Sequence, residues 1–183
     1  MIRYYILLLL GIVALSSFKP GLATDTEKMV WKEDRKLSWR DFKATPQPVS
    51  GYVASTHSGI SFSYSLRGNG NSVSVDYTVT SNFYPNLSWY QRKQVNAFIL
   101  AHEQTHFDIS ELHARILRKK MSEFHFKLDS KEAIETMYAE VEAQRRVFQQ
   151  RYDLETDHSR NEQAELNWRA EVANQLRQYE RWK

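Results

Sequence analysis

Two histidines four residues apart, with a glutamate between them, form the pattern in this chain most suited to chemistry. His102, Glu103 and His106 belong to the sequence His-Glu-Gln-Thr-His, which matches the H-E-x-x-H pattern. Residues four apart lie on the same side of a helix, so both imidazoles can bind one zinc ion. The glutamate then serves as the general base for a zinc-activated water. The pattern predicts that His102 and His106 are metal ligands and that Glu103 is catalytic.

The helix around this pattern is expected to turn both histidines inward. At 100° per residue they fall on one apolar stripe. A buried histidine must find a partner or stay neutral, which suits metal binding. His113 lies on the same stripe but too far along the axis to bind the same ion, so we expect it to pack. Glu111 points away from His106 and is predicted to be solvated or to contact another helix. The other members of the stripe are Val95, Phe98, Ile99, Ile109, Ile116 and Leu117.

The helix supplies only two ligands, whereas a catalytic zinc usually has three from the protein. The densest cluster of further candidates is an acidic segment, predicted to be a loop, that contains Asp153, Glu155 and His158. His57 and His125 are weaker candidates, because an isolated histidine is more often an ordinary solvent-facing one. The residues alone therefore predict a zinc site between the H-E-x-x-H helix and this segment, and leave the third ligand open.

Composition narrows the chemistry further. The 183 residues include no cysteine, so the chain has no disulfide, zinc-thiolate site or thiol nucleophile, and any metal must be held by His, Asp or Glu. The 25 Lys and Arg against 22 Asp and Glu leave a net charge of +3, too small an excess to indicate nucleic-acid binding. A hydrophobic content of 42% with a mean hydropathy of -0.61 excludes a multi-span membrane protein.

The first residues have the pattern of a secretion signal. Arg3 precedes an apolar run, and small residues follow, so that residues 1–16 are predicted to be a signal peptide cut after Ser16, with Ala23 as the alternative. The uncharged stretch is shorter than the roughly 20 residues that a spanning helix needs. We therefore expect a secreted or periplasmic protein with no stable membrane span after cleavage.

The remaining chain divides into an arm and one predicted domain. Residues 24–50 are polar with scattered aromatic anchors, and their prolines exclude a long helix, so we expect an arm that lies on a single domain formed by residues 51–183. Alternation of apolar and polar residues over 60–66 and 73–79 predicts a β-hairpin, joined by a third strand around 52–56.

Beyond Pro85 the periodicity becomes helical and predicts three helices. The sequence Ser-Trp-Tyr-Gln at 88–91 has the form of a capping box and predicts a first helix that runs to about Lys120. Asp129 or Ser130 is expected to cap the second, and the third is expected to begin near Asn161. The fold class is thus α+β, with a small antiparallel sheet followed by three long helices.

The chain also resembles a bacterial family of unknown function whose members are predicted to be secreted zinc-dependent proteases. The resemblance is carried by Leu-Ser-Trp-Arg-Asp-Phe at 37–42, Ser-Trp at 88–89, the stretch from His102 to Glu111, and Tyr-Asp-Leu-Glu-Thr-Asp-His at 152–158 followed by Gln163 and Trp168. It implies a zincin-like peptidase with His102 and His106 as ligands and Glu103 as base, and it draws attention to His158. On that ground we expect His158 to be the third ligand.

The resulting prediction is a secreted zinc-dependent metallopeptidase that hydrolyses peptide or protein substrates. Tyr152 or Arg145 is the candidate for stabilising the oxyanion, and an exposed strand could hold an extended peptide. Two other functions remain open: a non-catalytic envelope protein with a structural zinc, and a helical interaction module in which the motif occurs by chance.

Overall fold

A long β-hairpin and three helices build the molecule. The computed structural model describes residues 27–47, 51–68 and 73–183. The hairpin pairs β3 (Ser58–Gly68) with β4 (Val73–Phe83), antiparallel and in register from Ser58 opposite Phe83 to Gly68 opposite Val73. Helices α1 (Ala97–Glu123), α2 (Lys131–Thr156) and α3 (Glu162–Gln178) follow. The α+β prediction is confirmed, and the predicted signal peptide lies outside the described residues.

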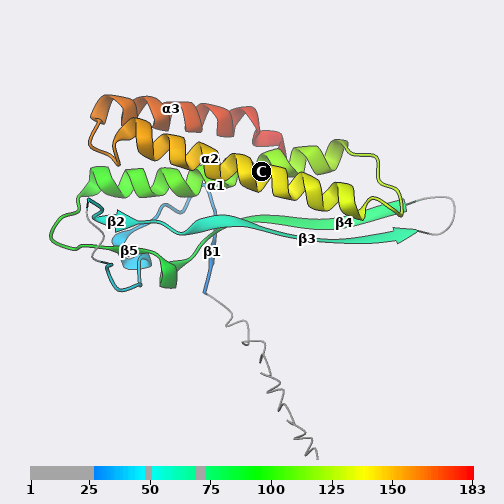
Figure 1. Ribbon diagram of the computed structural model, residues 1–183, viewed down its shortest axis with the longest axis horizontal. Helices are drawn as coiled ribbons and strands as arrows, with labels where there is room; N and C mark the ends of the chain where they lie inside the picture. Colours follow the sequence, from blue (N-terminus) through cyan, green and yellow to red (C-terminus); the bar gives the residue numbers. More distant parts are fainter. Residues whose placement is uncertain (1–26, 48–50, 69–72) are drawn as a thin grey trace, which may run out of the picture.

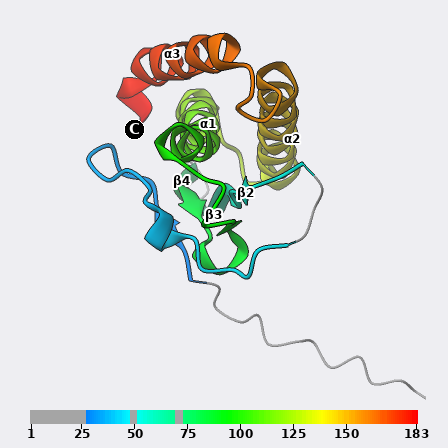
Figure 2. The ribbon, with the colours of Figure 1, turned by 90° about the vertical axis from the view of Figure 1, so that its left-hand side faces the viewer.

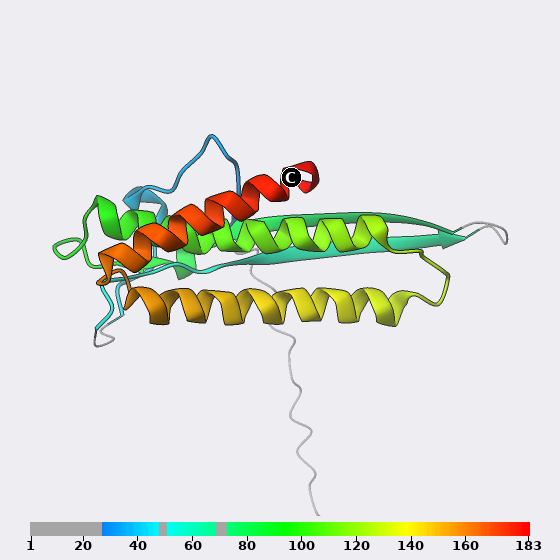
Figure 3. The ribbon, with the colours of Figure 1, turned by 90° about the horizontal axis from the view of Figure 1, so that it is seen from above.

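Helix α1 occupies the centre of the molecule. It lies along one face of the β3–β4 hairpin, and α2 and α3 pack against its other sides (Figures 1 and 2). Seen from above, α2 runs alongside α1, and α3 starts beside the end of α2 and crosses over α1 at a shallow angle (Figure 3). The apolar residues of the alternating strands face the helices, as Ile60 and Val79 do in the main core. This core also contains Ala114, Leu117, Met121, Ile134 and Val141.

The arm contributes the third strand of the main sheet. Strand β1 (Met29–Val30) pairs with the end of β4, which gives the order β1-β4-β3. Trp31, Leu37 and Phe42 are buried against Phe83 and Phe107, so the arm closes one end of the hairpin and one side of α1. A short 3-10 helix, η1 (Trp39–Asp41), shapes the turn between these anchors.

The strand expected around 52–56 belongs to a different sheet. Strand β2 (Ala54–Ser55) does not extend the hairpin but pairs antiparallel with β5 (Trp89–Tyr90). The same pairing shows why the predicted capping box at 88–91 was wrong. The Ser88 hydroxyl bonds to the carbonyl of Tyr84 and to the amide of His57, and it therefore cannot cap a helix.

The first helix therefore begins later than predicted. Its N-cap is Asn96, whose side chain accepts a hydrogen bond of 2.9 Å from the amide of Ile99. The other two helix starts agree with the sequence: Ser130 precedes α2, and Asn161 caps α3 by accepting from the amide of Ala164. In the part of the chain that the structure describes, no helix has both the length and the apolar character needed to cross a bilayer.

Candidate metal centre

Helix α1 places the two motif histidines side by side in the interior. His102 and His106 are one turn apart and are only 4% and 7% exposed. Their Nε2 atoms are 3.2 Å apart, with the two rings nearly perpendicular. The predicted inward orientation of both imidazoles is confirmed.

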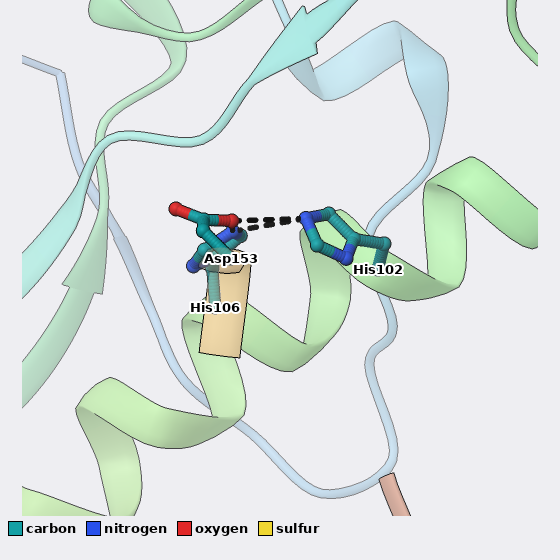
Figure 4. A group of neighbouring side chains, drawn as sticks. All are labelled: His102, His106 and Asp153. Carbon is teal, nitrogen blue, oxygen red and sulfur yellow. Dashed lines mark hydrogen bonds and ion pairs between the residues drawn. The ribbon is translucent and has the colours of Figure 1, made fainter. Parts of the chain in front are cut away.

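Asp153 completes a group of three donors. It lies in the last turn of α2, and its Oδ1 is 3.2 Å from Nε2 of His102 and 3.0 Å from Nε2 of His106 (Figure 4). Tetrahedral ligands at about 2.0–2.1 Å from a zinc ion lie about 3.3–3.4 Å from one another. The three atoms therefore need to move apart by only a few tenths of an ångström to accept such an ion.

The other nitrogen of each ring is held by an acceptor from a second helix. Nδ1 of His102 is 2.9 Å from Oε2 of Glu165 on α3, and Nδ1 of His106 is 2.7 Å from Oε1 of Gln149 on α2. The amide of Gln149 is oriented by its own donation to the carbonyl of His106 and to the Ser110 hydroxyl. Because each Nδ1 faces an acceptor, it carries the proton, and each Nε2 presents a lone pair to the centre.

The centre thus brings together two lone pairs and a carboxylate with no donor among them, so a single cation placed between them satisfies all three. In the absence of a metal that cation is a proton. Burial alone would lower the pKa of His102, but hydrogen bonds to Asp153 and Glu165 outweigh it and raise the pKa to about 9. Burial likewise opposes ionisation of Asp153, yet the two imidazoles hold the pKa of its carboxyl well below the usual range. The donor set fits a divalent metal.

Glu103 stands beside this centre with an unpaired oxygen. The residue is 4% exposed, and its Oε2 is buried without a hydrogen-bond partner among the residues that the structure describes. An unpaired buried carboxylate oxygen is costly unless a ligand or water completes it. Glu103 and the three metal donors line the same cavity of about 320 Å³. The segment around β2 and the turn after α2 form its walls: residues 51–56 and His158, Ser159 and Arg160.

Asp153 occupies the place that the sequence analysis gave to His158. Among the described residues, the group whose ligand atoms lie within 4.8 Å of one another is His102, His106 and Asp153. His158 also lines the cavity, and its Nδ1 lies 3.6 Å from Asp153 Oδ1. It does not belong to the group of three. Glu155 faces away and accepts from the indole of Trp168.

The predicted acidic loop is mostly helix, which explains this outcome. Helix α2 continues to Thr156, so Tyr152 and Asp153 are helical and the connection to α3 is only a short turn. Tyr152 and Thr156 are both fully buried, one turn apart, and the Thr156 hydroxyl bonds the carbonyl of Tyr152. The inward-facing side of α2 therefore continues with polar residues after the apolar ones. This change from apolar to polar residues was the reason for predicting an earlier end of the helix.

Neither candidate for oxyanion stabilisation is free in this structure. The Tyr152 hydroxyl donates to Oε1 of Glu165 at 2.6 Å, and its ring stacks on His102. Arg145 forms two hydrogen bonds of 2.9 Å with Glu142, away from the cavity. These contacts correct the roles expected for both residues.

The remaining candidates have structural positions. His113 bonds the carbonyl of Ile109 and is buried, as expected for packing, and burial lowers its pKa. Glu111 is 2% exposed, so the first alternative, a solvated side chain, was wrong. Its carboxylate pairs with Arg115 and Arg118, which lie on its own helix and not on another one. His57 and His125 are exposed.

Sequence reasoning missed the two residues that orient the imidazoles. Glu165 is fully buried and also accepts from Arg169 at 2.7 Å, yet it lies in a polar stretch of α3 that gives no ligand pattern. The only signal was its position on the helix face that carries the apolar residues Trp168 and Val172. Gln149 lies one residue from the apolar stripe of α2. Its side chain is uncharged, so nothing in the sequence marked it as a candidate for the site.

Comparison with known protein families identifies the family of this chain. Residues 34–159 match the family described as bacterial protein of unknown function, DUF922, which is more than half of the chain. The chain belongs to this family. The DUF922 match spans all three metal donors and ends before α3, so Glu165 lies beyond it. Comparisons with curated proteins and with solved structures gave no significant match.

Proposed function

We propose that this DUF922 protein is an exported, zinc-dependent metallopeptidase. The observation that carries the proposal is the convergence of His102, His106 and Asp153 beside the unpaired carboxylate of Glu103, in a cavity open to solvent. Two imidazoles and one carboxylate are a ligand set of catalytic zinc sites in peptidases. Export rests on the predicted signal peptide, and it gives a secreted or periplasmic location.

Each group in the cavity then has a task. His102, His106 and Asp153 hold the zinc ion, which when bound polarises the peptide carbonyl and lowers the pKa of a water. Glu103 accepts the proton of the attacking water and delivers it to the leaving amine. Glu165 and Gln149 keep the imidazoles in the tautomer that binds metal.

An extended peptide fits the wall of the cavity. Strand β2 pairs with β5 along one edge, and its sheet has only these two strands in the described chain, so no strand pairs with its other edge there. We propose that a substrate strand pairs with this edge. Residues 51–56 line the cavity along this strand. Backbone pairing of this kind would bind peptides of many sequences. It therefore supports a peptide substrate but does not predict which substrate side chains are preferred.

A structural zinc site is the second candidate, and the same observations weigh against it. Structural sites are usually closed by four protein ligands, whereas three donor residues converge here and the cavity leaves one side open. An interaction module with a chance motif would have no reason to gather two buried imidazoles and a half-buried carboxylate around one point.

Metal analysis and one substitution test the proposal. The purified mature protein should bind one zinc per chain, His106→Ala should lose most of it, and His125→Ala, which changes an exposed histidine, should keep it. Glu103→Gln should keep the metal and the fold while hydrolysis of labelled casein falls by about 10²- to 10⁴-fold, because the proton acceptor is gone. Equal zinc in wild type and His106→Ala, or full activity in Glu103→Gln, would contradict the proposal.

A further inference from the structure

The turn between α2 and α3 has an unfavourable backbone. Asp157, His158 and Ser159 have φ values of 47°, 51° and 71°, so three consecutive residues adopt the left-handed conformation without a glycine among them. Residues other than glycine adopt this conformation rarely and usually singly. Backbone of this kind persists only where the surrounding structure enforces it, and it is concentrated at functional sites.

Contacts on both sides of the turn enforce it here. The amide of His158 donates to the carbonyl of Asp153 at 3.0 Å, which ties the turn to the residue that faces the two histidines. The Arg160 guanidinium donates to the carbonyl of Gly51 at 2.9 Å, and the His158 ring packs edge-on against Tyr52, 4.7 Å between centroids. The turn is therefore fixed to both the end of α2 and the cavity wall near β2.

The strained turn sets the His158 imidazole at the edge of the metal centre. It lines the cavity together with Glu103 and the three donors. Its Nδ1 lies 3.6 Å from Oδ1 of Asp153, too far for a hydrogen bond, and the side chain is one third exposed. His158 is thus close to the centre, outside the group of three, and accessible to a bound molecule.

Hydrolysis of a peptide bond is accelerated by a hydrogen-bond donor beside the reacting carbonyl, because negative charge develops on its oxygen in the transition state. The hydroxyl of Tyr152 and the guanidinium of Arg145 are already bonded to carboxylates. Of the other side-chain donors lining the cavity, Arg160 is bonded to Gly51, and the Gln94 amide donates to Gln91. The hydroxyls of Tyr52, Ser55 and Ser159 line the cavity as well. His158 is singled out from them by its ring nitrogen, which lies 3.6 Å from Oδ1 of Asp153 at the edge of the metal centre.

We propose that His158 is a catalytic residue that donates a hydrogen bond to the oxyanion of the hydrolytic transition state, and that the left-handed turn exists to place it there. The inference rests on the proposed peptidase function. It requires that His158 acts without binding the metal. It also requires that the left-handed backbone at His158 lowers the stability of the fold.

The first test compares His158→Ala with His125→Ala in the zinc-loaded protein. The probe is a phosphonamidate dipeptide, whose tetrahedral phosphoryl oxygens resemble the oxyanion. His158→Ala should bind the probe on the order of 100-fold more weakly, while its zinc affinity, measured by chelator competition, stays within about threefold of wild type. His125→Ala should change neither quantity.

The second test measures strain by comparing His158→Gly with His158→Ala. Both variants remove the imidazole, but only glycine tolerates the left-handed conformation without cost. The glycine variant should melt about 2–4 °C above the alanine variant. Because both variants lack the imidazole, this difference measures the strain of the backbone alone.

Three results would overturn the inference. A loss of zinc affinity of tenfold or more in His158→Ala would make His158 a ligand, and unchanged probe binding, including a wild type that does not bind the probe, would make it a bystander. Equal melting temperatures of the glycine and alanine variants would show that the turn is not strained. The peptidase proposal is judged separately, by casein hydrolysis in wild type and Glu103→Gln, so a failure of the inference alone can be distinguished from a failure of the proposed function.

Discussion

Histidines on the same face of α1 have different chemistry because their partners differ. His102 and His113 are both 4% exposed. Nδ1 of His102 faces the carboxylate of Glu165 and its Nε2 faces Asp153, so negative charge favours a cation between them. His113 bonds a backbone carbonyl and packs edge-on against Phe148, and burial keeps its pKa low. Burial alone therefore does not distinguish the two histidines; the carboxylates around the ring of His102 do.

The partner of His102 gives the sharpest test at this scale. Glu165→Gln keeps the volume of the side chain but removes the charge that fixes the tautomer of His102, so zinc affinity should fall about 10- to 100-fold. The matched control is Glu171→Gln, an exposed residue on the same helix, which should bind zinc as wild type does. Chelator competition measures both. Equal zinc affinity in the two variants would show that Glu165 does not act on the metal centre.

At the scale of elements, the H-E-x-x-H helix is clamped by the arm. Gln104, between the two histidines, accepts a hydrogen bond of 2.7 Å from the amide of Leu37. Its amide donates to Asp108, which also accepts from the indole of Trp31 at 2.7 Å. One face of α1 thus holds the metal donors while another anchors the arm.

Removal of the shared acceptor should loosen this clamp. Asp108→Ala leaves the indole N–H of Trp31 and the amide of Gln104 without a partner, so the free energy of unfolding should fall by about 1–3 kcal/mol. Urea unfolding measures the change. Asp76→Ala, which removes an exposed ion pair with Arg67, should cost at most about 1 kcal/mol. A stability of Asp108→Ala equal to that of wild type would mean that the hydrogen bonds to Asp108 do not help to hold the arm.

At the scale of the whole molecule, the site exists only where several elements meet. The metal donors come from α1 and α2, the partner of His102 from α3, and the cavity wall from the segment around β2. At the far side of α1, Arg115 binds Glu111 and Glu180, and Arg118 binds the carbonyl of Trp182, so the C-terminal end of the chain is fixed to the same helix. Helix α1 is the common support for the sheet, the arm and the site.

The charge gathered at the centre couples stability to pH. The pKa of His102 in the metal-free protein is raised from 6.5 to about 9, so the folded state binds the proton more tightly than the unfolded state does. Its stabilising contribution is complete below about pH 6.5 and is lost as the pH rises through about 9. Because each pKa unit is worth about 1.4 kcal/mol, the loss is on the order of 3 kcal/mol.

Melting curves with and without metal measure this coupling. In a chelator, the melting temperature should fall by several degrees between pH 6.5 and 9, whereas the protein with one equivalent of zinc should lose less, because zinc replaces the proton. His106→Ala should no longer show the difference between the two conditions. A metal-free melting temperature that is constant or rises across this interval would contradict the prediction.

The sequence by itself determined the features that depend on local periodicity. The H-E-x-x-H residues share one face because a helix repeats every 3.6 residues, so the inward orientation of His102 and His106 followed from spacing. Alternation likewise predicted the β3–β4 hairpin, and Asn161 marked the start of α3. Each of these features depends on residues close in the chain.

Only the tertiary structure decided which acidic residue faces the histidines. Asp153 and Glu155 are two residues apart in a helix, about 200° around its axis, so when α2 packs on α1 one of them turns toward the histidines and the other away. The sequence had no means to give that packing angle, and it did not show that α2 continues past Tyr152. The role of Glu165 was hidden for the same reason, because its contact with His102 joins residues 63 positions apart.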